Sequence, residues 1–254
     1  MIYEDLKGKR VLVTGASSGI GAETAKMFAA QGCFVGVHYF RTEAGGGETL
    51  KQVKAVSDGC LLRADMRGEG QVEKLINDFV ESAGGLDILV NNAGTLIKRQ
   101  SIEEGTVEYY EDVFATNVKS TFLASRGALE HLKKTKGCIV NTGSVAGHNG
   151  GGGGSGLYSA AKAAVATLTI SMAKEFAQFG IRVNSVMPGL IETRFHEQFS
   201  TAERKEQVAA QTPLRRNGTA ADIAKAILFL SSNEASGFIT GEYIAVNGGL
   251  YMRA

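Results

Sequence analysis

Seven short apolar runs, separated by helix-like segments, constrain the fold of this chain more than any other feature of its sequence. They are rich in Val, Ile and Leu, and read RVLVTG, CFVGVHY, CLLRAD, LDILVNN, GCIVNTG, IRVNSVMP and YIAVNGG. Continuous apolar runs of this length are typical of strands buried on both faces, as in a parallel sheet. Helix-like segments such as IGAETAKMFAAQG, which ends in Gly32 where a helix C-cap is expected, lie between them.

This alternation predicts an α/β fold with a doubly wound, mostly parallel, seven-stranded sheet and helices on both faces, because right-handed crossovers connect parallel strands. The chain has 254 residues, 44% of them apolar, which is enough for one large core. The five glycines at 150–154 would normally mark a linker between domains. A boundary there would separate the fifth strand from a long helix, so we expect residues 1–254 to form a single domain.

The charge balance and the cysteines narrow the class of partner. Lys and Arg number 27 against 26 acids, so net charge gives no reason to expect nucleic acid or an anionic membrane. Cys33, Cys60 and Cys138 lie far apart in apolar runs, which is typical of reduced core thiols and not of disulfides or metal ligands. No window approaches ~18 uninterrupted apolar residues. We expect a cytoplasmic protein that binds a small molecule and no metal.

A glycine-rich turn follows the first predicted strand. Residues 10–21 read RVLVTGASSGIG, in which Gly15, Gly19 and Gly21 lie between a buried strand and a helix. Glycines allow the backbone to approach a pyrophosphate, and the free N–H groups and positive end of the helix stabilise its charge. The alternative is a turn selected only for tight packing of strand against helix. The context of strand, turn and helix favours a dinucleotide site.

The end of the second predicted strand bears on which dinucleotide is bound. An acid there would bind a ribose 2′-hydroxyl, but the chain reads His38, Tyr39, Phe40, Arg41. The guanidinium of Arg41 could form forked hydrogen bonds to a 2′-phosphate. This favours NADP(H) and leaves NAD(H) possible. Alternatively, Arg41 is an ordinary solvated loop residue.

Tyr158 and Lys162 are predicted to lie on one face of a helix, one turn apart, because four residues separate them. An ammonium beside a phenol favours the phenolate, so we expect Lys162 to lower the pKa of Tyr158 and make it an acid–base catalyst. Ser144, at the end of the fifth strand, could donate a hydrogen bond to a carbonyl oxygen where negative charge develops. Separately, each of these residues could instead have a purely structural role.

From residue 10 to residue 249 the sequence resembles the short-chain dehydrogenase/reductase family, which has a Rossmann-type fold. The family motif T-G-x-x-x-G-x-G matches Thr14 to Gly21, N-N-A-G matches Asn91 to Gly94, and Y-x-x-x-K matches Tyr158 to Lys162. The resemblance implies a catalytic set of Asn117, Ser144, Tyr158 and Lys162. It implies cofactor contacts from Gly15, Ser17, Ser18, Gly19, Ile20, Gly21, Arg41, Asp65, Met66, Asn91, Ala93, Gly94, Tyr158, Lys162, Pro188, Gly189, Ile191 and Thr193.

Within the resemblance, Asp65 would contact the adenine ring and Asn91 the adenine-ribose side of the cofactor. Ile191 and Thr193 would lie by the nicotinamide carboxamide, and Asn117 would hold a water that joins Lys162 in a proton relay. The implied reaction is hydride transfer between the nicotinamide and a carbonyl or secondary alcohol. The family's enoyl reductases usually space Tyr and Lys more widely, which favours C=O over C=C chemistry here.

The favoured function is an NADP(H)-dependent ketone reductase, and three alternatives stay open. They are an NAD-linked sugar or polyol dehydrogenase, a β-ketoacyl-carrier-protein reductase, and a regulatory dinucleotide-binding protein without catalysis. Carrier-protein reductases tend to have a basic residue where this chain has Phe179, although Lys133, Lys134 and Lys136 could supply charge elsewhere. A free small-molecule carbonyl is therefore preferred.

Two segments are expected to form the walls of a substrate pocket. Ser144 and Tyr158 are fourteen residues apart where the family more often has thirteen, so 150–156 is interpreted as a mobile wall that orders when ligand binds. A lid is expected near 189–212. Expected apolar members of the cavity are Leu96, Ile97, Leu190, Phe195 and Phe199, with His148 and His196 as further candidates. The pair Lys98 and Arg99 could attract an anionic substrate but is usually a solvated pair. By resemblance, segment 117–132 and the Tyr158 helix form a homotetramer interface.

Overall fold

Seven strands form one parallel sheet in the computed structural model, which describes residues 2–252. The strand order is β3-β2-β1-β4-β5-β6-β9, and every neighbouring pair is parallel. The strands are β1 (Arg10–Val13), β2 (Phe34–Tyr39), β3 (Asp58–Arg63), β4 (Ile88–Asn91), β5 (Cys138–Thr142), β6 (Arg182–Pro188) and β9 (Tyr243–Val246). Six lie within the apolar runs and β3 starts two residues before its run, so the predicted Rossmann-type sheet is confirmed.

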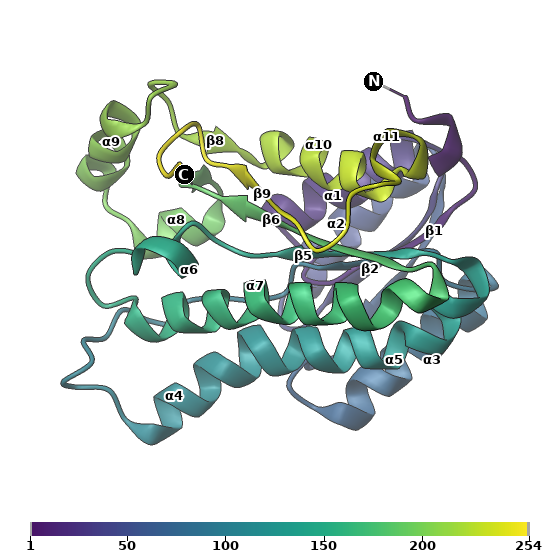
Figure 1. The fold of residues 1–254 in the computed structure, drawn as a ribbon, viewed down its shortest axis with the longest axis horizontal. Helices are drawn as coiled ribbons and strands as arrows, with labels where there is room; N and C mark the ends of the chain where they lie inside the picture. The colour runs from purple at the N-terminus through teal and green to yellow at the C-terminus, as the bar shows by residue number, and fades with distance from the viewer. Residues whose placement is uncertain (1, 253–254) are drawn as a thin grey trace.

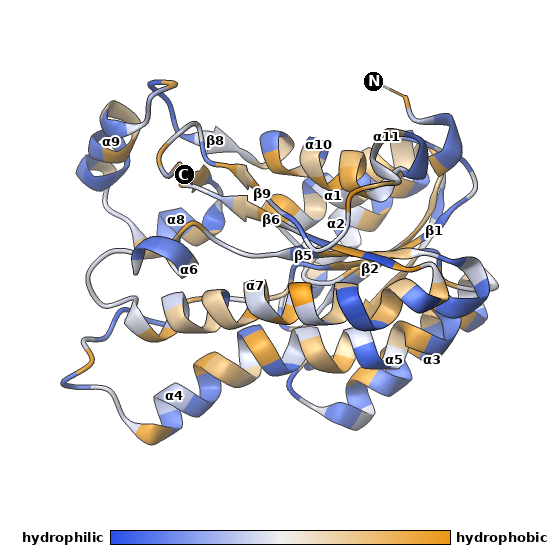
Figure 2. Cartoon of the chain, viewed as in Figure 1, coloured by the Kyte–Doolittle hydropathy of each residue, from blue (hydrophilic) through white to orange (hydrophobic). Residues whose placement is uncertain are grey.

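Helices cover both faces of this sheet (Figure 1). One layer contains α1 (Gly19–Ala30), α2 (Glu43–Lys54) and α10 (Ala220–Ser231), and α1 packs against both of the others. The opposite layer contains α3 (Glu69–Ala83), α5 (Ser120–Thr135) and α7 (Gly156–Phe176). The strands between the layers are predominantly apolar in Figure 2, as burial on both faces requires.

Adjacent residues of one strand supply two separate cores. Val11 and Val13 of β1 point toward α1 and α10, whereas Leu12 between them points toward α3 and α5. All three side chains are fully buried. Because successive side chains of a strand point to opposite faces, a strand covered on both sides must be apolar at every position. This is why the runs in the sequence are continuous and not alternating.

The remaining elements lie mainly around the carboxyl edge of the sheet. β7 (Ile191–Glu192) and β8 (Gly218–Thr219) form a two-stranded parallel ladder that the sequence did not indicate. Between them, α8 (Arg194–Phe199) and α9 (Ala202–Gln211) occupy the segment expected to be a lid (Figure 1). The others are η1 (Glu4–Leu6), α4 (Val107–Phe114), η2 (Ala115–Lys119), α6 (Ala146–Asn149), η3 (Ala177–Phe179) and α11 (Asn233–Ser236).

The glycine run joins α6 to α7, and both β5 before it and α7 after it pack against β6. Cys33 and Cys138 are buried free thiols, and Cys60 is a half-buried one. Within residues 2–252, no helix has both the length and the apolar character needed to cross a bilayer.

Candidate active site

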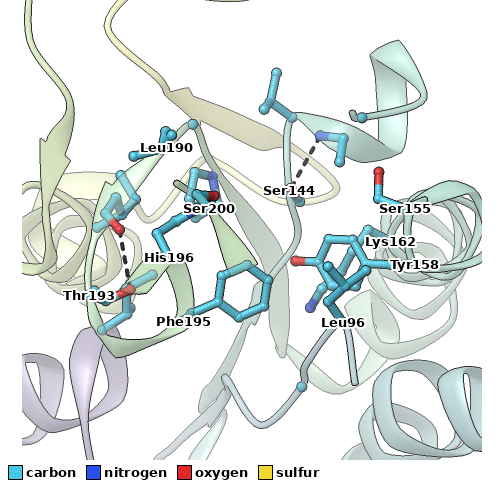
Figure 3. A pocket seen from close by; sticks show the side chains of 18 of the residues that line it. Leu96, Ser144, Ser155, Tyr158, Lys162, Leu190, Thr193, Phe195, His196 and Ser200 are labelled. Atoms are coloured by element: carbon cyan, nitrogen blue, oxygen red, sulfur yellow. Dashed lines mark hydrogen bonds between the residues drawn. The ribbon is translucent and has the colours of Figure 1, made fainter. Parts of the chain in front are cut away.

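A cavity of about 520 Å³ opens at the carboxyl edge of the sheet (Figure 3). Its lining comes from the segments after β1, β4, β5 and β6, and from parts of α7, α8 and α9. Ligands of open α/β sheets bind at this edge, because loops from several strands converge there. The cavity is therefore the first candidate for a functional site.

The glycine-rich turn forms one wall of this cavity by close backbone packing. Gly15 has φ +66°, and a Cβ atom there would lie 2.9 Å from Cα of Ala93. A Cβ atom on Gly21 would lie 2.3 Å from the Gly15 carbonyl oxygen. Helix α1 starts here with Ser18 as N-cap, without a side-chain cap and without an acid in its first turn. The first-turn amides are thus available to an anion, which fits the pyrophosphate of a dinucleotide.

Two side chains that sequence reasoning missed hold this turn. The Gly15 amide donates to Nδ1 of His38 at 2.9 Å, and Nε2 of that ring lies 3.1 Å from the Ala64 carbonyl oxygen. Burial lowers the pKa of His38 to about 4, so the ring is neutral and its Nε2–H donates. Asn92 Nδ2 donates to the Thr14 and Gly15 carbonyl oxygens at 3.0 and 3.1 Å. The sequence signal for this role was a polar residue, His38, inside an otherwise apolar strand.

Ser144, Tyr158 and Lys162 meet at the inner end of the cavity, where β5 ends and α7 begins (Figure 3). The Lys162 ammonium donates to the Thr142 carbonyl oxygen at 2.8 Å and lies 5.8 Å from the centre of the Tyr158 ring. The Ser144 hydroxyl accepts the Ala146 amide at 3.1 Å and also hydrogen-bonds Tyr158. A phenol, a hydroxyl and an ammonium are thereby presented together to the cavity.

The expected effect of Lys162 on Tyr158 was wrong in this structure. Burial raises the pKa of Tyr158 to about 12, although the hydrogen bond with Ser144 acts in the opposite direction. Burial also lowers the pKa of Lys162 to about 8. Desolvation disfavours both charged forms, and it is the main cause of both shifts. The phenol is therefore held protonated near neutral pH.

Asn117 lies beside this group on a turn of π-helix, η2, between α4 and α5. Its Nδ2 donates to the carbonyl oxygens of Thr95 and Val113, both at 2.9 Å, whereas its buried Oδ1 has no partner among the described residues. A Cβ atom on Gly94 would lie 2.6 Å from that Oδ1 and 3.2 Å from Lys162 Nζ. The orphaned acceptor thus faces the ammonium side of the site, and π turns often occur at such positions.

Twelve of the predicted cofactor residues line the cavity, and they are Gly15, Ser18, Gly19, Ile20, Ala93, Gly94, Tyr158, Lys162, Pro188, Gly189, Ile191 and Thr193. Others lie outside it. Arg41 is an exposed residue that follows β2, and the Asp65 carboxylate accepts hydrogen bonds from the Arg67 amide and guanidinium. The Met66 side chain packs in the core, while Ser17 lies in the turn and Gly21 in the first turn of α1.

Asn91 is the remaining predicted cofactor residue that does not line the cavity. Its side chain does not face the cavity, because Nδ2 donates to Ser125 Oγ at 3.0 Å and to Asn141 Oδ1 at 2.9 Å in a buried network between β4, β5 and α5. A contact with the adenine ribose would have to come from its backbone. Successive residues of a strand point to opposite faces of the sheet, and the motif alone did not indicate which face the Asn91 side chain would take.

The outer part of the cavity is partly apolar, as expected from Leu96, Leu190 and Phe195, which line it. The Phe195 ring faces Tyr158 with 6.0 Å between ring centres (Figure 3). Three expected members do not line it. Ile97 packs beside α4 and α7, the Phe199 ring meets that of Phe195 edge-on with 4.9 Å between ring centres, and His148 stacks on Tyr251. His196 does line it.

Arg99 is more than the solvated charge that sequence reasoning expected by default. Its Nε donates to the Phe199 carbonyl oxygen at 2.8 Å, and its NH1 donates to the Gly153 carbonyl oxygen at 2.7 Å. The same side chain thus connects α8 with the glycine run. Lys98 points elsewhere, with its ammonium 5.1 Å from the Tyr109 ring centre.

Comparison with known proteins identifies the family. A family model described as Enoyl-(Acyl carrier protein) reductase, from the short-chain dehydrogenases/reductases, matches residues 15–251. The chain belongs to the short-chain dehydrogenase/reductase family. It is 39% identical over 250 residues to 3-oxoacyl-[acyl-carrier-protein] reductase FabG of Staphylococcus aureus (strain Mu50), with 96% of this chain and 98% of the relative covered.

Solved structures agree with this assignment. NADH-dependent reductase A1-R′, responsible for alginate metabolism, matches with a TM-score of 0.91 and 34% identity, covering 99% of this chain and 100% of that chain. The same reductase complexed with NAD matches with a TM-score of 0.89 and 33% identity over the same shares. This short-chain dehydrogenase/reductase is an oxidoreductase that acts on CH–OH or C=O groups with a nicotinamide dinucleotide.

Proposed function

We propose that this short-chain dehydrogenase/reductase is an NADP(H)-dependent ketone reductase. The observation that carries the proposal is the convergence of Ser144, Tyr158 and Lys162 on one end of a cavity whose other end is the glycine-rich turn. The cavity thus has an anion-binding turn for the cofactor pyrophosphate at one end and a protonated phenol for the substrate at the other. The spacing of Tyr158 and Lys162 favours C=O over C=C as the group reduced.

The residues of the chain have distinct roles in this reaction. A bound NADPH would supply hydride, with both electrons, to the carbonyl carbon. Tyr158 donates the proton to the carbonyl oxygen, and the product is a secondary alcohol. Ser144 donates a hydrogen bond to the oxygen as its negative charge develops. Lys162, with a pKa of about 8, stabilises the resulting phenolate, and Asn117 positions the water through which the phenol regains a proton.

The preference for NADP(H) rests on Arg41. Its exposed guanidinium lies 5.4 Å from the Phe40 ring centre at the end of β2, where an acid would be needed for a ribose 2′-hydroxyl. The solved relative with bound NAD keeps NAD(H) as the alternative. Arg41→Asp should weaken NADPH binding about tenfold or more, because a phosphate loses a cation and meets an anion. Unchanged NADPH affinity would reject the assignment.

A β-ketoacyl-carrier-protein reductase is the second candidate, because the curated relatives named FabG share 39% of their residues with this chain. The position expected to be basic is Phe179, and the Lys133 ammonium lies 4.2 Å from the centre of its ring. That cation also pairs with Glu130, which weakens it as a site for an acidic carrier. A free ketone therefore remains the preferred substrate.

The assembly and the lid are further parts of the proposal. We expect segment 189–212 to close over the substrate and a homotetramer to form through α5 and α7. Phe122 on α5 is 43% exposed in the single chain, which fits a helix that a second copy covers. Light scattering of the wild type and of Phe122→Glu tests the assembly, with a smaller species expected for the variant.

NADPH oxidation tests the function directly. The wild type should oxidise NADPH with at least one member of a panel of ketones, aldehydes and β-ketoacyl thioesters, with NADH measured in parallel. Tyr158→Phe should lose about a hundredfold or more of the rate and still bind NADPH, since only the proton donor is removed. No turnover on any carbonyl, with tight NADPH binding, would favour the alternative without catalysis.

A further inference from the structure

The cavity is lined by cations without matching acids. Arg99, Lys162, Arg194 and Arg204 line it, and no Asp or Glu is among the lining residues that the structure describes. His196 adds no negative charge. A cavity lined by one sign of charge raises the local concentration of ligands of the opposite sign. The question is which of these cations act on the cofactor and which act on the substrate.

The positions of the cations separate them into two groups. Lys162 belongs to the catalytic group. Arg194 directly follows Thr193, and the Thr193 side chain would lie 3.3 Å from a Cβ atom on Gly19. Arg194 therefore lies on the side of the phosphate-binding turn. Arg99 and Arg204 come from other segments, the loop after β4 and helix α9. They are left for the substrate.

Arg99 is a preorganised charge. Its two hydrogen bonds, at 2.8 and 2.7 Å, go to the neutral carbonyl oxygens of Phe199 and Gly153. Among the ion pairs of residues 2–252, none includes Arg99 or Arg204. Glu192 pairs with Lys205 at 3.3 Å, and the acids nearest Arg204 in sequence, Glu203 and Glu206, are exposed and do not line the cavity. An anion at Arg99 would meet a fixed cation and would not have to displace a carboxylate.

A continuous path leads from the reacting phenol to this charge. The ring centres of Tyr158 and Phe195 are 6.0 Å apart, and those of Phe195 and Phe199 are 4.9 Å apart. The Phe199 carbonyl oxygen accepts a hydrogen bond from Nε of Arg99. Leu96 and Leu190 line the same cavity. The cavity thus has a proton donor at one end, an apolar middle and a cation at its rim.

We propose that the substrate is an oxo acid, whose ketone lies at Tyr158 and whose carboxylate binds Arg99 and Arg204. This assignment rests on the proposed function and names the substrate class of the same site. It makes Arg99 and Arg204 specificity-determining residues, since they bind a group that does not react. The reaction is unchanged: hydride goes to the carbonyl carbon, the proton of Tyr158 goes to the oxygen, and the carboxylate is retained in the hydroxy acid.

Matched pairs of oxo acids and their methyl esters test this assignment. Pyruvate, acetoacetate and levulinate place the carboxylate progressively farther from the ketone, and each methyl ester keeps the ketone and removes the charge. With NADPH, at least one acid should exceed its ester in kcat/KM by about tenfold or more. The ratio should fall as salt is added, because screening weakens attraction between exposed charges.

Variants separate charge from structure. Arg204→Gln should lower kcat/KM for the preferred acid about tenfold and leave that of its ester nearly unchanged. Arg99→Gln also loses the contact with the glycine run, so it should lower kcat/KM for both substrates, and for the acid about tenfold more than for the ester. Arg99→Lys should retain part of the preference, since it keeps the charge and loses the fork. Lys225→Gln, which removes an exposed cation on α10, is the control and should change neither.

The outcomes are distinct for the two proposals. Equal kcat/KM for acid and ester, turnover of esters alone, or no turnover of any acid would overturn the oxo-acid assignment. Neutral ketones reduced in a Tyr158-dependent manner would still support the proposed function in each of those cases. An equal loss of kcat/KM for acid and ester in both Arg variants would show that Arg99 and Arg204 have a structural role and do not recognise the carboxylate, and this also overturns the assignment.

Discussion

The wall formed by residues 14–21 and the wall formed by residues 150–156 are both rich in glycine, but their glycines have different surroundings. A Cβ atom on Gly21 would collide with backbone at 2.3 Å, whereas one on Gly153 would meet nothing within 4 Å. The first wall uses glycine for close packing around a fixed cradle. The second has open space at Gly153 and uses glycine for positive φ at Gly151 and Gly154, both at +70°.

The contacts that hold each wall follow the same division. Residues 14–16 are held by the buried His38 ring and by Asn92. The glycine run is held at its surface by Arg99, through the Gly153 carbonyl oxygen, and by the Gln100 amide, which donates to Gly154. This difference suggests that residues 14–21 form a rigid wall for the cofactor and that residues 150–156 form a looser wall for the substrate.

Gly21→Ala should give the largest effect, because the new methyl group must displace the Gly15 carbonyl from the cradle. We expect NADPH affinity to fall about a hundredfold or more, with stability lowered by about 1–3 kcal/mol from overpacking. Gly47→Ala, in open space on α2, is the matched control and should change neither. Fluorescence titration with NADPH and thermal unfolding measure both. An unchanged NADPH affinity would contradict the rigid cradle.

Acid should destabilise the first wall through His38. Its pKa is lowered to about 4 by burial, against an ordinary value of 6.5, so the folded state keeps the ring neutral. The stabilisation is present above pH 6.5 and is lost as the pH falls toward 4, because the unfolded chain binds the proton more readily. The loss should reach about 3 kcal/mol.

Denaturant unfolding across this pH range measures the effect of His38. His38→Gln, which keeps a donor and an acceptor but does not titrate, should flatten the profile. His196→Gln is the comparison, since burial also lowers the pKa of His196 to about 4, and this residue lies on α8, outside both walls. Equal slopes for His38→Gln and the wild type would show that the buried ring does not couple this wall to pH.

A smaller effect is expected within the glycine run itself. Gly151 has φ +70° and a Cβ there would lie 2.5 Å from Ser155 Oγ, so Gly151→Ala should be strained by about 1–2 kcal/mol. We expect the substrate KM to rise about tenfold with NADPH affinity unchanged. Gly153→Ala should behave like the wild type. Weaker NADPH binding in Gly151→Ala would show that the two walls are coupled.

Hydrogen exchange should give the subtlest distinction between the walls. Amides of residues 150–154 should exchange faster than those of Gly15 and Ala16, which donate to the His38 ring and carbonyl. NADPH with substrate should slow exchange in the glycine run, as expected for a wall that orders on binding. If exchange there is unaffected by both ligands together, the interpretation of 150–156 as a mobile wall is wrong.

Most of the fold could be predicted, because burial on both faces of a parallel sheet leaves a strong sequence pattern. All seven strands overlap the apolar runs, and Ser144, Tyr158 and Lys162 come together as their spacing indicates. The two-residue strands β7 and β8 were missed because periodicity needs a longer segment to be visible.

The remainder depends on tertiary structure that spacing does not encode. The pKa of Tyr158 depends on how completely its phenol is desolvated, and a sequence does not give that. The Asn91 side chain turns into the core because of the pleat of β4, and Arg99 meets the carbonyls of Gly153 and Phe199 only once three distant segments are folded. The catalytic roles of the site residues stay predictions until the variants are measured.

The π turn at Ala115–Lys119 carries a consequence for how this chain can vary. It contains one more residue than an α-helical turn would, and each residue of a helix advances it by about 100°. Deletion of one residue there would restore a regular helix and rotate Asn117 away from Lys162, or else turn α5 relative to α4. The rotation of α5 about its axis and the position of Asn117 are therefore linked, because one residue in the π turn changes both. Insertions or deletions in α4 and α5 should be tolerated only in compensating pairs.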